Sequence, residues 1–138
     1  MSKKIIVVMA GSLILLSGCV NQFNQVYKSA DNDIKYEYAK ECYAKGKFVK
    51  ATTLLQEIVT IQKGTDNGEE CLFMLAMAEF KSKDYETAAE YFKKYYKSYP
   101  KGVYAEMAAY YIGESLYMST PEPRLDQTET VNAISAFQ

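Results

Sequence analysis

Apolar residues recur at spacings of three and four along most of the chain, beginning near residue 31. The stretch from 48 to 61 shows this most clearly, with apolar side chains at Phe48, Ala51, Leu54, Leu55, Ile58 and Ile61. This spacing places them on one face of a helix. Breaks at Gly46, in "KGTDNG" and at Pro100 separate one such segment from the next. The pattern predicts an all-α protein built from short amphipathic helices.

The helical pattern repeats with an offset of 37 residues. Small residues keep this offset at Ala39, Ala76 and Gly113, and Ala51 stands 37 residues before Ala88. Self-similarity at this period is typical of a stacked helical array. We therefore expect three repeats, at about residues 32–65, 69–102 and 106–138, of which the last is incomplete. In the third repeat, eight additional residues enter the loop around "STPEPRLDQ".

Small and bulky residues alternate in a way that is similar to the tetratricopeptide repeat. A small residue stands where paired helices would cross, and a bulky one follows four positions later, as in Ala88 and Phe92. Small residues there allow close backbone approach. Glu79 departs from the pattern, because an aromatic residue is usual at that position. The expected fold is a solenoid of tetratricopeptide-type helical hairpins, with about two and a half repeats.

The N-terminus has the features of a bacterial lipoprotein signal. Lys3 and Lys4 precede a twelve-residue apolar run, Ile5 to Leu16. As a helix this run would span only ~18 Å of the ~30 Å hydrocarbon core. The following "LSGC" resembles the lipobox, which implies cleavage of residues 1–18 and lipidation of Cys19. Residues 19–30 would then form a lipidated tether. The alternative is an ordinary secreted protein with a cysteine there by chance.

Composition excludes several functional classes. The chain has no histidine, which removes the commonest general base and a common metal ligand. Its 16 basic and 17 acidic residues are balanced, so nothing suggests nucleic-acid binding. Neither a phosphate-binding loop nor a metal-ligand cluster is apparent, and we expect no enzyme, metal or cofactor. Cys42 and Cys71 could form a disulfide or remain small buried thiols.

Two longer segments resemble the BamD family of outer-membrane assembly lipoproteins. They are "YPKGVYAEMAAYYIGESLY" and "STPEPRLDQTETVNAISAFQ". Members of this family carry about five repeats, so the resemblance implies that this chain is an N-terminal portion. It also implies a non-enzymatic scaffold of the β-barrel assembly machinery. Its partners would be the integral barrel subunit, other members of the complex and unfolded outer-membrane proteins.

The position after Cys19 bears on location. Residue 20 is valine rather than the aspartate of the common inner-membrane retention signal, and no acidic run follows. These features favour a lipid anchor in the periplasmic leaflet of the outer membrane.

In tetratricopeptide arrays the first helix of each pair lines a concave face. By family analogy, the aromatic residues and methionine expected to bind peptide there are Tyr36, Tyr43, Phe73, Met77, Phe80, Tyr110 and Tyr117. Aromatic rings offer a large contact area at low entropic cost, and methionine adapts to varied partners. Two alternatives are that these side chains pack within the array or that they dock a folded partner.

Other roles remain open for a lipid-anchored repeat protein. One is an adaptor for cell-wall or secretion complexes. Another is a surface lipoprotein that binds glycans through aromatic side chains, which the absence of tryptophan disfavours. The loop "STPEPRLDQT" could contact a partner subunit or be a simple insertion on a solvated face.

Overall fold

The computed structural model describes residues 22–120 and 127–137, and every regular element in these residues is a helix. A short helix over residues 22–27, which we call the N-terminal helix, comes first. The six longer helices are α2 (Asn32–Ala44), α3 (Phe48–Ile58), α4 (Gly68–Lys81), α5 (Tyr85–Ser98), α6 (Ala105–Met118) and α7 (Thr128–Ala136). The predicted all-α class is confirmed. The signal peptide, Cys19 and most of the loop around Arg124 lie outside the described residues.

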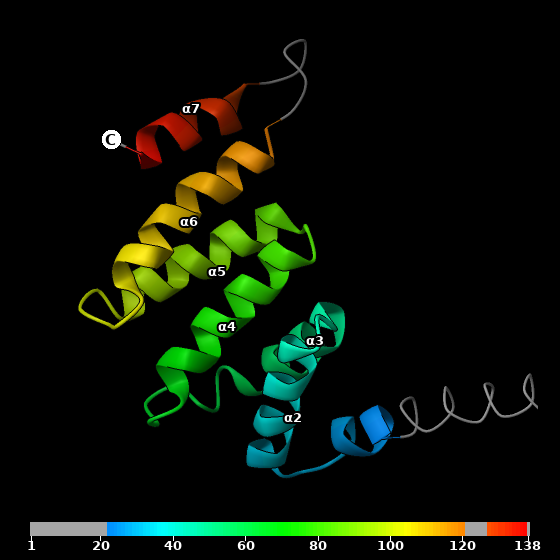
Figure 1. Ribbon diagram of the computed structural model, residues 1–138. Coiled ribbons are helices and arrows are strands. Elements are labelled where there is room, and N and C mark those ends of the chain that lie inside the picture. The colour runs from blue at the N-terminus through cyan, green and yellow to red at the C-terminus, as the bar shows by residue number, and fades with distance from the viewer. Residues whose placement is uncertain (1–21, 121–126, 138) are drawn as a thin grey trace, which may run out of the picture.

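The helices form antiparallel pairs that stack one on the next (Figure 1). All the substantial helix contacts in the described residues join neighbours along the chain, from α2 against α3 to α6 against α7. Each pair therefore contacts only the pair before it and the pair after it. This is the arrangement of a helical-hairpin repeat array, as the 37-residue period predicts.

Local sequence explains where two of the helices begin. The Asp31 carboxylate accepts hydrogen bonds from the backbone N–H groups of Asp33 and Ile34, at 2.9 and 3.2 Å. Asp84 caps α5 in the same way, by accepting from the N–H of Thr87 at 3.2 Å. These contacts satisfy donors that have no partner inside the first turn. No helix of the described part of the chain is long and apolar enough to cross a membrane.

Small residues occupy the crossings of the paired helices, where the sequence pattern places them. Ala39, Ala51, Ala76 and Ala88 are fully buried. Gly113 has the same role, because a Cβ built on it would lie 2.6 Å from the ring of Phe137. The largest fully buried side chains fill the space beside these crossings: Tyr36, Leu54, Leu55, Ile58, Leu75, Phe92 and Tyr95.

The N-terminal helix lies within residues 19–30, where the sequence suggests a lipidated tether. Phe23 and Val26 pack against the main hydrophobic core, and the rings of Phe23 and Tyr27 stack with centroids 6.0 Å apart. The Lys50 ammonium lies 5.2 Å from the Phe23 ring centroid, which joins this helix to the first turn of α3. Apolar side chains at positions 23 and 26 therefore dock part of the expected tether on the first repeat.

Cys42 and Cys71 are both buried and not disulfide-bonded. Of the two possibilities that the sequence left open, the structure shows small buried thiols.

Candidate peptide-binding site on the first-helix face

The candidate site lies on the face formed by the first helices of the pairs, α2, α4 and α6, which we call the first-helix face. A pocket of about 140 Å³ opens there. Its lining residues come from α2, from α4 and from the turn before α6: Tyr43, Glu70, Phe73, Met74, Met77 and Tyr104. We call it the aromatic pocket.

Phe73 forms the aromatic centre of this pocket. Its ring stacks on that of Tyr104, with centroids 4.4 Å apart and planes 10° from parallel. It also makes edge-to-face contacts with Phe92 and Tyr95, at 5.8 and 5.5 Å. Such pairs contribute roughly 0.5–1.5 kcal/mol each beyond the burial of their area. Phe73 is therefore held rigidly, with 8% of its surface exposed.

Tyr43 and Met77 complete the apolar lining from either side. Tyr43 of α2 is half-buried and meets the ring of Phe48 edge-on at 5.4 Å. Its burial, with a smaller contribution from Tyr111, raises the pKa of its phenol. Met77 retains 9% exposure. Because methionine is flexible and polarizable, this wall can adjust to different side chains.

The pocket has one charged group at its edge, the carboxylate of Glu70. The Tyr36 phenol donates a hydrogen bond of 2.8 Å to Glu70 Oε2. Tyr36 is 1% exposed, so it supports the edge of the pocket from below and cannot contact a ligand directly in this conformation. Burial, and then the bond to Glu70, raises the pKa of Tyr36 well above its usual value.

A group of hydrogen bonds holds the turn before α6, which carries Tyr104. Glu69 accepts hydrogen bonds from the Tyr95 hydroxyl and from the backbone N–H of Val103, the latter at 2.6 Å. The Tyr95 oxygen in turn accepts from the N–H of Tyr104 at 3.1 Å. Gly102 leaves room for this cluster, because a Cβ there would lie 2.6 Å from the Tyr95 hydroxyl. The position of Tyr104 over Phe73 is thus set by bonds between repeats.

The structure brings together only part of the predicted binding strip. Tyr43, Phe73 and Met77 share the aromatic pocket, whereas Phe80 is half-buried beside Tyr85 and Tyr111, at 5.3 and 5.0 Å. Phe80 therefore takes part in packing within the array.

Tyr110 and Tyr117 are the exposed members of the predicted set, at 54% and 61%. They lie on α6 outside the aromatic pocket, and the Tyr110 hydroxyl donates to Glu114 at 3.3 Å. This carboxylate, more than the slight burial, raises the pKa of Tyr110. The predicted residues thus fall into a pocket group, a packing group and an exposed group.

Sequence reasoning missed Tyr104 and Met74 as pocket residues. Tyr104 precedes α6 and has no counterpart at a groove-facing repeat position, so periodicity carries no signal for it. Its placement depends on the contact with Phe73. Met74 directly follows Phe73 on α4. Its side chain lines the pocket because α2, which carries Tyr43, packs beside α4.

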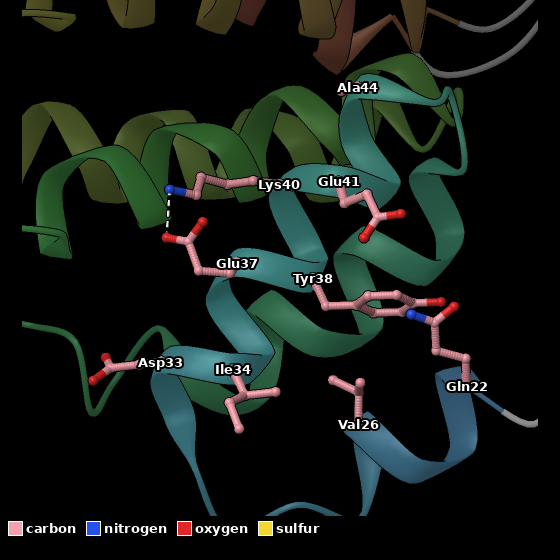
Figure 2. A pocket seen from close by; sticks show the side chains of 9 residues that line it. All are labelled: Gln22, Val26, Asp33, Ile34, Glu37, Tyr38, Lys40, Glu41 and Ala44. Atoms are coloured by element: carbon pink, nitrogen blue, oxygen red, sulfur yellow. Dashed lines mark ion pairs between the residues drawn. The ribbon is translucent and has the colours of Figure 1, made fainter.

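A larger and more open groove lies at the N-terminal end of the array (Figure 2). It has a volume of about 810 Å³ and runs between the N-terminal helix and α2. Three carboxylates and one lysine line it, and Lys40 pairs with Glu37 at 2.6 Å. The predicted aromatic strip does not extend into this groove.

Aromatic rings and methionines make up most of the lining of the aromatic pocket. No group of three or more histidine, cysteine, aspartate or glutamate residues suitable for a metal occurs in the residues that the structure describes. The aromatic pocket is also smaller than the roughly 300–1,000 Å³ of typical small-molecule sites. Its size fits one side chain of a longer ligand.

Comparison with known proteins places the chain in a family. The model of a family described as YfiO, outer membrane lipoprotein, matches residues 28–138. A curated relative from Aquifex aeolicus (strain VF5), "Putative outer membrane protein assembly factor BamD", is 34% identical over 99 residues. That alignment covers 70% of this chain but only 31% of the relative. The chain therefore belongs to the YfiO family of outer membrane lipoproteins.

Proposed function

We propose that this protein is a lipid-anchored scaffold in the periplasmic leaflet of the outer membrane that recognises unfolded outer-membrane proteins and supports their insertion. Membership in an outer membrane lipoprotein family supports the location. The similarity to a putative assembly factor supports the role in outer-membrane assembly. The aligned stretch spans 31% of that relative.

The aromatic pocket is the observation that carries substrate recognition. It presents Phe73 and Tyr104 as a stacked pair, with Met74 and Met77 as adjustable neighbours. Such a surface would take an aromatic or large apolar side chain from an extended chain segment. Glu70 at the edge could accept an N–H of the bound segment. Selection of unfolded segments follows, because folded proteins bury most such side chains.

Binding to other subunits requires a second surface. Tyr110 and Tyr117 of α6 are exposed and stand apart from the pocket, so they are candidates for contact with the integral barrel subunit or another member of the machinery. The proposed role is thus one of adaptor: one surface takes the substrate, and another holds the partner.

Site-specific crosslinking tests substrate recognition. The photoreactive residue p-benzoyl-phenylalanine would replace Tyr43 or Met74 in the full chain, and Lys97 on the exposed side of α5 as the control. The probes are a synthetic peptide of the last strand of an outer-membrane barrel, which ends in an aromatic residue, and the same peptide ending in serine. We expect crosslinks at positions 43 and 74 with the aromatic peptide alone. Equal crosslinking at position 97, or by the serine peptide, would refute the pocket as the recognition site.

Substitutions test the same proposal in cells. Alanine at Phe73 should reduce both crosslinking and barrel assembly, whereas alanine at Tyr110 and Tyr117 should reduce barrel assembly alone; unchanged values for both variants would contradict the proposal. Copurification of partner proteins with the full-length protein distinguishes the β-barrel assembly role from the cell-wall adaptor role. A barrel subunit recovered with the protein supports assembly, whereas peptidoglycan enzymes would support the cell-wall adaptor instead.

A further inference from the structure

Glu70 is an exposed carboxylate that lines the aromatic pocket beside five uncharged side chains. Within the part of the chain that the structure describes, each ion pair joins a lysine to a glutamate other than Glu70. Lys40 lies close by, with its ammonium 4.8 Å from the Tyr36 ring centroid, but it pairs with Glu37 at 2.6 Å. The pocket therefore carries a negative charge that no cation of the described residues neutralises.

The Glu70 carboxylate is held through one of its two oxygens. Its Oε2 accepts the hydrogen bond of 2.8 Å from the Tyr36 phenol. Because burial raises the pKa of Tyr36, the phenol stays protonated and acts as the donor. A carboxylate has about four acceptor positions, so this bond leaves Oε1 available to a ligand. An acceptor that is already oriented loses less conformational freedom when a ligand binds.

The spacing along α4 determines which residue of a ligand can reach Glu70. Glu70 stands three residues before Phe73 and four before Met74. Side chains at these separations are neighbours on a helix, with Cβ atoms about 5–6 Å apart. In an extended segment, side chains two positions apart point to the same side and lie about 7 Å from each other. A ligand residue two positions from the one in the pocket can therefore face Glu70, whereas the adjacent residue points away.

We propose that Glu70 makes the aromatic pocket select extended segments that carry a lysine or arginine two positions from the aromatic side chain in the pocket. This inference rests on the proposed recognition of unfolded segments, and it names the class of segment that is recognised. Tyr36 is a positioning residue, because it acts on the ligand only through Glu70. A carboxylate at the same position of the ligand would be repelled.

The exposure of Glu70 limits the strength of this selection. Ion pairs between solvent-exposed groups change an equilibrium constant by roughly two- to fivefold. Salt screens such pairs, so the preference for a basic residue should decline as the ionic strength rises. The aromatic side chain would supply most of the affinity, and the basic residue would decide between segments that have one.

Fluorescence anisotropy of labelled synthetic peptides measures the selection. The full chain would be titrated against three peptides that share an aromatic last residue and carry lysine, glutamine or glutamate at the third position from the end. We expect the lysine peptide to bind roughly two- to fivefold more tightly than the glutamine peptide, and the glutamate peptide to bind most weakly. A fourth peptide with its lysine next to the last residue should bind like the glutamine peptide, because that side chain points away.

Substitution of Glu70 tests whether this carboxylate is responsible. Glu70→Gln should remove the difference between the lysine and glutamine peptides, and Glu70→Lys should make the glutamate peptide the tightest. Glu106→Gln is the matched control, because Glu106 is exposed in the first turn of α6 and does not line the pocket. A preference for lysine that persists in Glu70→Gln, or its absence from the wild type, would overturn the inference.

Tyr36→Phe tests the positioning role. This variant keeps the charge of Glu70 but releases its carboxylate, so the ratio of the affinities for the lysine and glutamine peptides should fall towards one. Circular dichroism at the temperature of the titration verifies that the variant is folded. A purely structural role of Tyr36 would lower stability and leave this ratio unchanged, which would contradict the positioning role.

Peptides that end in serine separate this inference from the proposed function. If the aromatic peptides bind more tightly than the serine peptides but show no preference for lysine, selection by Glu70 alone fails. If the aromatic and serine peptides bind equally, the aromatic pocket is not the recognition site, and the proposed function and the present inference both fail.

Discussion

Tyr36 of α2 and Glu70 of α4 are joined by a hydrogen bond of 2.8 Å between neighbouring repeats. The donor is almost completely buried, and the acceptor lies at the edge of the aromatic pocket. The bond therefore connects the stacking of the first two repeats to the shape of the candidate site.

Tyr36→Phe should lower the free energy of unfolding by roughly 1–2 kcal/mol, because a bond to a charged acceptor is lost while the ring remains. Urea unfolding followed by circular dichroism measures the loss. Tyr96→Phe is the matched control, since Tyr96 is 46% exposed and should change stability by less than about 0.5 kcal/mol. Equal losses in the two variants would show that the Tyr36–Glu70 bond contributes nothing specific.

The turns after α2 and α4 have the same geometry, although one uses glycine and the other lysine. Gly46 and Lys83 stand 37 residues apart and have φ values of 69° and 70°. In each turn the following N–H bonds to a carbonyl five residues earlier, as in Lys47 to Cys42 at 2.8 Å and Asp84 to Glu79 at 3.0 Å. This pattern ends helices with a left-handed residue, a conformation that disfavours side chains.

Lys83→Gly should therefore stabilise the fold by about 0.5–1 kcal/mol despite the greater freedom of glycine in the unfolded chain. Thermal unfolding measures the change. Lys94→Gly, in the middle of α5, should instead cost about 1 kcal/mol, because glycine is unfavourable inside a helix. A loss of stability in Lys83→Gly would contradict the expected strain.

Glu79 is a buried carboxylate at the position where an aromatic residue is usual in the repeat. It is 6% exposed and accepts a hydrogen bond of 2.9 Å from Gln56 of α3. Burial, and then the charge of Asp84, raise the pKa of Glu79, although the Gln56 bond opposes them. Tyr91 of α5 also lies near this group.

Because the folded state raises this pKa, the protonated form is favoured by folding. The contribution of Glu79 to stability is complete below the unfolded pKa of about 4.3 and is lost as pH rises through the folded pKa. Glu79→Gln should therefore be more stable than the wild type at pH 8, and the difference should vanish near pH 4. Denaturant unfolding at several pH values measures it. An advantage of Glu79→Gln over the wild type that is equal at pH 8 and pH 4 would contradict the raised pKa.

The two buried cysteines should be chemically inert in the native protein. Burial is the main cause that raises the pKa of Cys71 to about 12, and burial also raises the pKa of Cys42. Since the thiolate is the reactive form, neither should react with iodoacetamide at pH 8 until the protein unfolds. Mass spectrometry after timed labelling tests this. Lys47→Cys, on an exposed turn, should react at once, and comparable labelling of Cys71 in the native state would contradict its burial.

The repeat array could be predicted from the sequence because its signals are local or periodic. Alanine at positions 39, 51, 76 and 88 marked the helix crossings, and these residues are fully buried. The N-terminal helix could not be predicted in this way. Its six residues are too short to show periodicity, and Phe23 and Val26 are held by α2 and α3.

The candidate site could be predicted only in part. Counting positions along the first helices selects Tyr43, Phe73 and Met77, which line one pocket, and their role in binding stays a prediction. It did not separate them from Tyr36, which is buried below, or from Tyr110, which is exposed outside the pocket. The position of a residue in the repeat determines which side of its helix it occupies. How far its side chain is buried depends on the packing of the neighbouring repeat.

The sequence by itself determined the helix pairs, their period, the small residues at the crossings and the family. Each of these depends on residues close together in the chain or on a pattern that recurs at a constant interval. The tertiary structure decided that Tyr104 stacks on Phe73, that Tyr36 supports Glu70, and that the N-terminal helix is docked. These contacts arise where different repeats or segments meet, and their geometry depends on how closely the helices pack.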